Sequence, residues 1–232
     1  GFDVILGIDS WDLSLETFKK NHSNSQILSA DISKISPKEV SNKTDIKDVD
    51  VIIGGPPCQC FSITGKRIVD DPRNKLYKSF VNFVNFYKPK AFLMENVPNL
   101  LSMQGGQLRN EMLEDFEKLG YRVRYDVLLA SDYGIPQNRK RVFFVGIKGN
   151  DKFQFPQKTH GSGLLPHVTI KEAISDLPED DLPDGSQYPS KPLSDYQAVM
   201  RSGSNGIYGH ETIKHTDKTI QIIGLVPDEG NY

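Results

Sequence analysis

Four side chains with catalytic potential stand beside apolar runs of this sequence. Glu95 comes directly after an apolar run, and Cys58 comes shortly after another. Arg139 and Arg141 precede a third run. A thiolate can act as a nucleophile, a carboxyl group can carry a proton, and a guanidinium group can hold a carbonyl or a phosphate. These residue types predict a site that forms a covalent intermediate and stabilises the charge that develops on its substrate.

Cys58 lies in the pentapeptide Gly55–Gln59, which contains two prolines and follows Gly54. The prolines fix φ, and the glycines permit a sharp turn or the close approach of a ligand. Such rigidity suits a nucleophile that must meet one atom of a substrate. The alternative is a buried, inert cysteine after a proline-rich turn.

The elements that would position these residues follow from apolar periodicity. Strands are expected at 4–9, 26–32, 49–54, 91–96, 121–130 and 141–148, and helices near 11–21, 73–87 and 106–119. This alternation predicts an α/β fold with a doubly wound, mostly parallel sheet. Ligands bind at the carboxyl ends of the strands in such sheets, where Cys58 and Glu95 would lie. In the second helix, a stripe at three- and four-residue steps is expected to be buried: Leu76, Phe80, Val84 and Tyr87.

Composition limits the class of protein. The chain has 232 residues, 37% of them hydrophobic, and a formal net charge of -2, so contact with nucleic acid would need a local basic patch. Its two cysteines, Cys58 and Cys60, are too close for a structural disulfide and too few for a zinc site. We therefore expect no bound metal and a reducing, cytoplasmic setting, and the lack of a long apolar run argues against a membrane protein.

Several motifs in their order resemble those of the DNA cytosine-5 methyltransferases. The segments that carry the resemblance are 54–59 with Phe61 and Ser62, then 71–77, then 95–97, and finally 137–141. Together they are specific, and they cover the first two thirds of the chain strongly and the rest weakly. The resemblance implies a Rossmann-like methyltransferase fold, S-adenosyl-L-methionine as the methyl donor and double-stranded DNA as the substrate.

The resemblance also implies a role for each of the residues first described. Cys58 would add to C6 of a cytosine flipped out of the duplex, so that C5 becomes nucleophilic towards the methyl group. Glu95, expected to be buried and to carry a proton, would share that proton with N3; the alternative is a carboxylate that caps the backbone or pairs with an arginine. Arg139 and Arg141 alternate, so both are expected on one face, holding the cytosine carbonyl, a phosphate or Glu95.

The cofactor would be held at other strand ends. An acid that closes a strand commonly accepts the ribose hydroxyls of a nucleoside, and Asp9 has that position, with Ser10 or Trp11 against the adenine. Asp31 and Ile32 resemble the pair that meets the adenine edge, and Pro56 and Leu76 complete the predicted cofactor site. For Asp9 and Asp31, a helix-capping or turn role is the alternative.

The segment after Cys58 resembles the loop that closes over DNA in this family. The residues expected to contact DNA are Gln59, Ser62, Thr64, Lys66 and Arg67. A solvated loop is the alternative. Cys60 departs from the small residue, usually glycine, that the family has there.

The resemblance implies two regions. Residues 1–150 would form the catalytic methyltransferase domain, and the loop-rich residues 151–232 would lead into the target-recognition region, where His210 and His215 are expected in a surface loop. The family's glycine-rich cofactor loop should precede Gly1 and its last motifs should follow Tyr232. We therefore expect a fragment or one piece of a split enzyme, with a complementary chain as a partner.

The favoured function is a bacterial restriction-modification methylase that acts on DNA. Two alternatives remain open: a transfer RNA cytosine-5 methyltransferase, which would use the same motifs, and a non-catalytic DNA-binding subunit. A cysteine hydrolase is weaker, because no histidine stands near the motifs at the strand ends to serve as its base.

Overall fold

The computed structural model describes residues 1–57, 76–149, 151 and 153–227. These residues form two compact units, which are described separately below. The first contains 1–132 and 138–158, and the second contains 133–137 and 159–232. The division near residue 150 that the sequence suggested stays a prediction.

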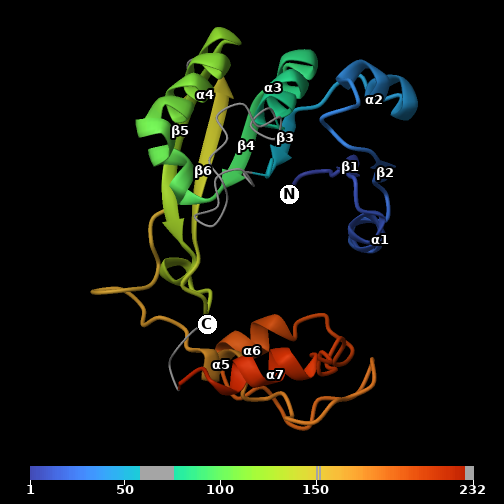
Figure 1. The fold of residues 1–232 in the computed structure, drawn as a ribbon, viewed down its shortest axis with the longest axis vertical. Helices are drawn as coiled ribbons and strands as arrows, with labels where there is room; N and C mark the ends of the chain where they lie inside the picture. Colours follow the sequence, from blue (N-terminus) through green and yellow to red (C-terminus); the bar gives the residue numbers. More distant parts are fainter. Residues whose placement is uncertain (58–75, 150, 152, 228–232) are drawn as a thin grey trace. The chain divides into compact units, whose positions relative to one another are not determined.

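All six expected strands are present in the first unit (Figure 1). They are β1 (Leu6–Asp9), β2 (Gln26–Ser29), β3 (Val51–Gly54), β4 (Ala91–Asn96), β5 (Tyr121–Leu129) and β6 (Lys140–Lys148). The helices between them are α1 (Asp12–Asn21), α2 (Pro37–Thr44), α3 (Leu76–Tyr87) and α4 (Gln107–Lys118), with 3-10 turns η3 (Pro98–Gly106) and η4 (Ala130–Tyr133). The predicted α/β fold class is confirmed.

The strands form two sheets. β1 and β2 make a parallel pair, and the other four follow the order β3-β4-β6-β5. β3 and β4 are parallel, while β6 is antiparallel to both of its neighbours. β3, β4 and β5 therefore run in one direction and only β6 is reversed, which fits the mostly parallel sheet that was predicted.

The core of this unit lies between the four-stranded sheet and the helices α3 and α4. Phe92 of β4 meets Phe116 of α4 with ring centroids 4.1 Å apart, and Phe80 of α3 contacts both rings edge-on. The two helices therefore pack on the same face of the sheet. A Cβ atom on Gly146 of β6 would lie 2.0 Å from the Phe92 ring, so only glycine fits beneath it.

The stripe predicted for α3 is partly right. Phe80 and Val84 are buried, but Leu76 and Tyr87 are only half-buried, and Tyr77 and Phe83 are buried as well. The helix thus turns a wider face to the core than one row of side chains.

The sequence analysis did not predict α2. Its start has a capping box, in which the Ser36 hydroxyl accepts a hydrogen bond from the Glu39 amide and the Glu39 carboxylate accepts one from the Ser36 amide. Pro37 occupies the first turn, where its missing N–H costs no helical hydrogen bond. These three residues were the signal for a helix start.

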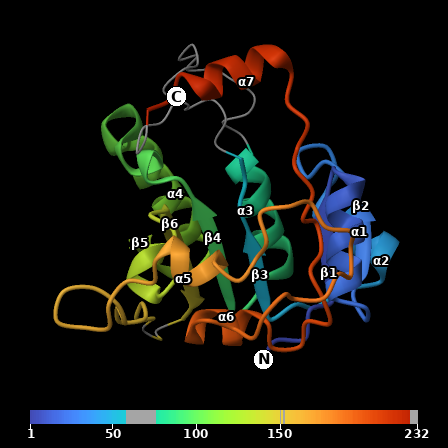
Figure 2. The same ribbon diagram turned by 90° about the horizontal axis from the view of Figure 1, so that it is seen from below.

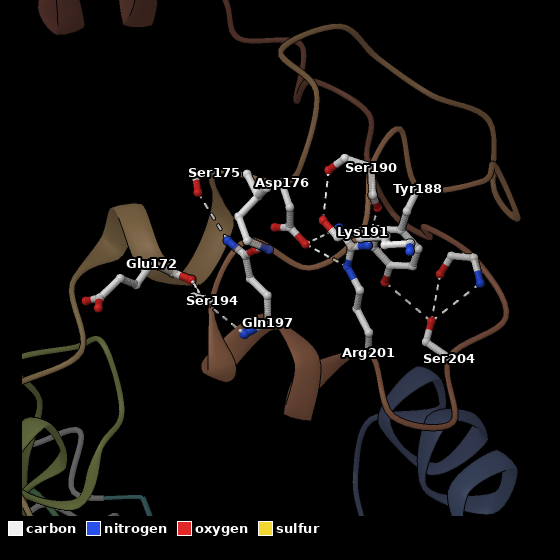
Figure 3. Close-up of polar contacts among 12 residues, drawn as sticks. Glu172, Ser175, Asp176, Tyr188, Ser190, Lys191, Ser194, Gln197, Arg201 and Ser204 are labelled. Carbon is white, nitrogen blue, oxygen red and sulfur yellow. Dashed lines mark hydrogen bonds and ion pairs between the residues drawn. The ribbon is translucent and has the colours of Figure 1, made fainter.

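The second unit has short helices joined by loops, as its composition suggested. They are α5 (Ile170–Ile174), α6 (Asp195–Met200) and α7 (Asp217–Gly224). Its centre is polar (Figure 3): the Arg201 guanidinium pairs with the buried Asp176 carboxylate and stacks 3.7 Å from the Tyr188 ring centroid. Gln197, 1% exposed, donates a hydrogen bond to the Ser175 hydroxyl at 3.1 Å. Polar contacts thus hold together loops that have few apolar residues to bury.

His210 belongs to this unit. Its Nε2 lies 2.8 Å from the Pro178 carbonyl oxygen, and its ring is half-buried, whereas His215 is exposed. In the described ranges, no group of three or more residues that bind metals comes together. Nor does any helix of the described chain have the length and apolar character needed to cross a bilayer.

Candidate active site

The turn that leads from β3 towards Cys58 is fixed at two points. A Cβ atom on Gly54 would lie 2.8 Å from the Phe80 ring, so glycine lets α3 pack directly against the end of the strand. Pro56 is buried, and its carbonyl oxygen accepts a hydrogen bond of 2.9 Å from Asn96 Nδ2 at the end of β4. Cys58 itself lies outside the described residues, but the backbone that enters it is held by these contacts.

Asn96 was not among the predicted site residues. It is 6% exposed, and its Oδ1 atom accepts a hydrogen bond from the Val97 amide at 2.9 Å. One amide side chain thus ties the ends of β3 and β4 together. The position of Asn96 in the sequence was the signal for this role. An asparagine at the end of a strand, before Val-Pro, can supply hydrogen bonds to a neighbouring turn whose prolines have no N–H group.

We expect Asn96→Ala to lower the free energy of unfolding by about 1–3 kcal/mol, because the substitution leaves the Val97 amide and the Pro56 carbonyl without their partner. Urea unfolding followed by circular dichroism measures this. Asn82→Ala, at an exposed position of α3, is the matched control and should change stability by less than about 0.5 kcal/mol. Equal effects of the two substitutions would contradict the bridging role of Asn96.

Glu95 and Arg141 form an ion pair beside this turn. Arg141 Nε lies 2.8 Å from Glu95 Oε1, and the side chains are 24% and 35% exposed, respectively. Strand pairing explains the contact: Glu95 stands opposite Phe143, and Arg141 lies two residues from Phe143 on the same face. A Cβ atom on Gly55 would lie 3.4 Å from Glu95 Oε2, so the turn after β3 passes close to this carboxylate.

The structure differs from the expectation for Glu95 in one respect. The side chain is half-exposed rather than buried, and its partner is a guanidinium, which was the alternative considered for it. The pair therefore presents both a carboxylate and a cation at the end of β4.

Arg139 is placed differently from Arg141. It precedes β6, its side chain is exposed, and its carbonyl oxygen accepts a hydrogen bond from the Ala130 amide at 2.9 Å. Arg141 also donates from Nη1 to the Lys140 carbonyl oxygen at 2.8 Å. Of the two predicted arginines, only Arg141 is brought to Glu95.

The predicted cofactor residues of β1 are exposed at its carboxyl end. Asp9 Oδ1 accepts a hydrogen bond of 2.9 Å from the Trp11 amide, which stabilises the turn into α1. The Trp11 indole is 64% exposed, and Ser10 between them is exposed as well. A carboxylate beside an accessible aromatic face fits a nucleoside, because the acid can accept from ribose and the ring can stack on a base.

Asp31 lies in a turn beyond β2, not at its end. The strand stops at Ser29, two residues before the acid and three before the predicted end. Asp31 Oδ1 accepts hydrogen bonds from the Ser33 amide and hydroxyl at 2.9 and 2.6 Å, and Oδ2 pairs with Lys34 at 3.0 Å. The turn role considered for Asp31 is thus present in the structure, and the neighbouring Ile32 is half-buried.

These contacts lower the pKa of Asp31 to about 2 from its usual 3.8, mainly through the Ser33 hydrogen bonds. A carboxyl group with a lowered folded-state pKa stabilises the fold above its unfolded pKa and loses that effect as the pH falls through the folded value. We therefore expect Asp31→Asn to reduce stability above about pH 4 and to have little effect near pH 2. Urea titrations at a series of pH values measure the difference, and a loss that is the same at all pH values would contradict it.

The remaining predicted residues divide between two groups. Pro56 is buried and Leu76, the first residue of α3, is half-buried. The predicted DNA contacts lie outside the described residues, as Cys58 does: Gln59, Ser62, Thr64, Lys66 and Arg67. The described contacts therefore join the turn at 54–57, the end of β4 and the start of β6, while the predicted cofactor residues at the end of β1 belong to the separate two-stranded sheet.

The sequence of this chain matches a known family of proteins. The family profile for C-5 cytosine-specific DNA methylases matches residues 1–227. The Type II methyltransferase M.DdeI of Desulfomicrobium norvegicum is 39% identical over 95% of this chain and 54% of its own length. The Type II methyltransferase M.AquIA of a Picosynechococcus species is 34% identical over 77% of this chain and 81% of its own length.

Solved structures agree with the sequence comparison. A crystal structure of a DNA modification methyltransferase encoded within an E. coli prophage has a TM-score of 0.63 and 31% identity, over 82% of this chain and 52% of that chain. This chain spans little more than half the length of M.DdeI and of several similar relatives. With a family profile that matches nearly all of its residues, the chain belongs to the C-5 cytosine-specific DNA methylases.

Proposed function

We propose that this chain carries the catalytic residues of a DNA cytosine-5 methyltransferase of a bacterial restriction-modification system, working in the cytoplasm. The observation that supports this most is the joining of three strand ends at one place: the Asn96 bond holds the turn to Cys58, and Arg141 holds Glu95 beside that turn. The acid and the cation then lie beside the turn that leads to the nucleophile.

The chemistry follows from these residues. The Cys58 thiolate adds to C6 of a cytosine that has left the duplex, and the new C–S bond pushes electron density towards C5 and N3. Glu95 shares a proton with N3 of the base. Arg141 stays on the same face and holds Glu95 or the cytosine carbonyl, and Arg139 is free to meet a phosphate.

S-adenosyl-L-methionine would supply an electrophilic methyl group for C5, and loss of the C5 proton and of the Cys58 thiolate from C6 would then complete the substitution. Asp9 and Trp11 suit the ribose and adenine of this cofactor. The other residues predicted to contact the cofactor are Ser10, Ile32, Pro56 and Leu76. An adenine amine would have to compete with Ser33 for the Asp31 carboxylate. We therefore assign the main polar contact with the cofactor to Asp9.

The predicted DNA contacts are also part of the proposal. Lys66 and Arg67 meet phosphates, and Gln59, Ser62 and Thr64 add polar contacts near the flipped base. A complementary chain that supplies further motifs fits the share of M.DdeI that this chain leaves unmatched.

The test is a methyl-transfer assay on two proteins. One is the chain itself, and the other is M.DdeI with its matched segment replaced by this chain, called here the M.DdeI chimera. We expect transfer of a labelled methyl group to C5 of cytosine in unmethylated duplex DNA and none to transfer RNA. Transfer to transfer RNA alone would favour the RNA enzyme, and a folded chimera that binds DNA but not S-adenosyl-L-methionine would favour a DNA-binding subunit.

A further inference from the structure

The exposed Arg139 lies at the end of the connection between β5 and β6. Residues 130–139 join β5, the edge strand of the four-stranded sheet, to β6 beside it (Figure 2). The connection begins with the turn η4, and the Ala130 amide in that turn donates to the Arg139 carbonyl oxygen at 2.9 Å. The position of Arg139 therefore depends on how η4 is held.

A buried acid lies in η4. The Asp132 side chain is 11% exposed, and its Oδ2 atom pairs with Lys158 Nζ at 2.7 Å. Acidic side chains are rarely buried unless a cation or hydrogen bonds compensate their charge. Lys158 follows β6 and belongs to no strand, and its own side chain is 65% exposed. The pair therefore fastens η4 to a segment that takes no part in the strand pairing of the sheet.

The segment that carries Lys158 is itself anchored along β5. Arg124 of β5 donates from Nη1 to the Phe153 carbonyl oxygen at 3.0 Å. The Phe153 ring packs edge-on against Phe155, with 5.0 Å between the ring centroids, and both rings are half-buried. Lys158 thus extends from a fixed backbone towards η4.

The same two segments meet again two residues further on, in the second unit. A Cβ atom on Gly134 would lie 2.6 Å from His160 Cε1, so the ring packs directly on the glycine backbone. Gly134 also has a φ of +81°, a conformation that glycine adopts without strain. The contact between Lys158 and Asp132 is therefore part of a longer packing and not an isolated meeting of surface side chains.

We infer that Lys158 and Asp132 are positioning residues for the contact of Arg139 with a DNA phosphate. Lys158 holds the Asp132 carboxylate, which fixes η4. The Ala130 amide, in the same turn, then holds the backbone of Arg139. Direct contact of Lys158 with DNA is the competing role, but it would leave the buried Asp132 without this cation. The inference rests on the proposed function for the phosphate contact of Arg139.

Binding of unmethylated duplex DNA to the M.DdeI chimera tests the inference without methyl transfer. Removing an acid from a DNA-binding protein ordinarily strengthens binding, because its repulsion from the phosphates is lost. We expect the opposite for Asp132→Asn, a loss of affinity of about three- to tenfold, and a similar loss for Lys158→Met. A folded Asp132→Asn variant that binds DNA as well as the parent, or better, would overturn the inference.

The matched control is Lys90→Met, which removes the same charge. Lys90 also pairs with an aspartate at 2.7 Å, Asp50, but both side chains are more than two thirds exposed. Loss of this pair should leave the affinity for DNA within about twofold. If the control weakened binding as much as Lys158→Met does, the effect would come from the lost charge, and the positioning role would be wrong.

Arg139→Gln separates a positioning role from direct contact. If Lys158 acts through Arg139, adding Lys158→Met to Arg139→Gln should weaken binding by less than about twofold more. The salt dependence of the double variant should then fall by one phosphate contact, a change in slope of about 0.9. Two losses that multiply, with the slope reduced by two contacts, would make Lys158 a DNA contact and refute the inference.

Amide hydrogen exchange of the chain alone tests the first link without DNA. Lys158→Met should speed exchange at Ala130 by about tenfold or more, because a loosened η4 releases the bond to Arg139. Exchange at 91–96, in β4, should not change. Unchanged exchange at Ala130 would contradict the inference whatever the variant does to DNA binding. If the parent chimera bound no DNA, the proposed function would fail, and exchange at Ala130 would still decide how Arg139 is held.

Discussion

Glu95→Gln is expected to lower the rate of methyl transfer by roughly 100- to 10,000-fold, the usual contribution of a positioned acid. Glutamine keeps the size of the side chain and can still bond to Arg141, which now pairs with Glu95 at 2.8 Å. It cannot deliver a proton to N3 as the thiolate adds to C6. Single-turnover assays of the M.DdeI chimera, with and without the substitution, measure the loss.

The matched control is Glu114→Gln. Glu114 is 64% exposed on α4 and makes only a surface ion pair of 3.6 Å with Lys118, so its loss should leave the rate within about twofold. If Glu95→Gln raised KM and left kcat unchanged, Glu95 would be a binding residue and the proton-sharing role would be wrong.

Asp176→Ala should destabilise the second unit by about 3–5 kcal/mol, because it leaves the Arg201 guanidinium buried without its anion. Asp176 is 4% and Arg201 12% exposed, and Arg201 also donates from Nε to Asp176 at 2.7 Å. Since Arg201 links the loop at Ser190 to α6, the surrounding backbone should loosen with it. Urea unfolding followed by tyrosine fluorescence measures the change.

Asp50→Ala provides the comparison. Asp50 pairs with Lys90 at 2.7 Å, but both side chains are more than two thirds exposed, so we expect a loss of at most about 1 kcal/mol. Similar losses for the two aspartates would show that burial does not set the strength of the Arg201 pair.

Much of the site could be predicted because its residues lie at strand ends. Apolar runs locate β3 and β4 within a residue or two, and the polar residue after each run marks the carboxyl edge of the sheet. Local patterns were also sufficient for α1 and α4. The capping box of α2 was visible at Ser36 and Glu39 but lies outside a clear apolar periodicity.

Other features depend on pairing between distant segments, which no local pattern contains. The alternation of Arg139 and Arg141 put both on one face, but the register of β4 with β6 decided that only Arg141 reaches Glu95. The reversal of β6 and the separation of β1–β2 from the larger sheet are also long-range results. Asp31 was expected at the end of a strand, yet β2 ends at Ser29, and the hydrogen bonds from Ser33 put Asp31 at the start of a turn.

Covalent trapping tests the central claim most directly. The M.DdeI chimera is incubated with S-adenosyl-L-methionine and duplex DNA in which the target cytosine carries fluorine at C5, which blocks release of the enzyme after methyl transfer. We predict a denaturation-resistant protein–DNA adduct, mapped to Cys58 by mass spectrometry and absent with Cys58→Ser. A chimera that binds S-adenosyl-L-methionine and DNA but forms no adduct, or one whose Cys58→Ser variant still forms it, would contradict the account.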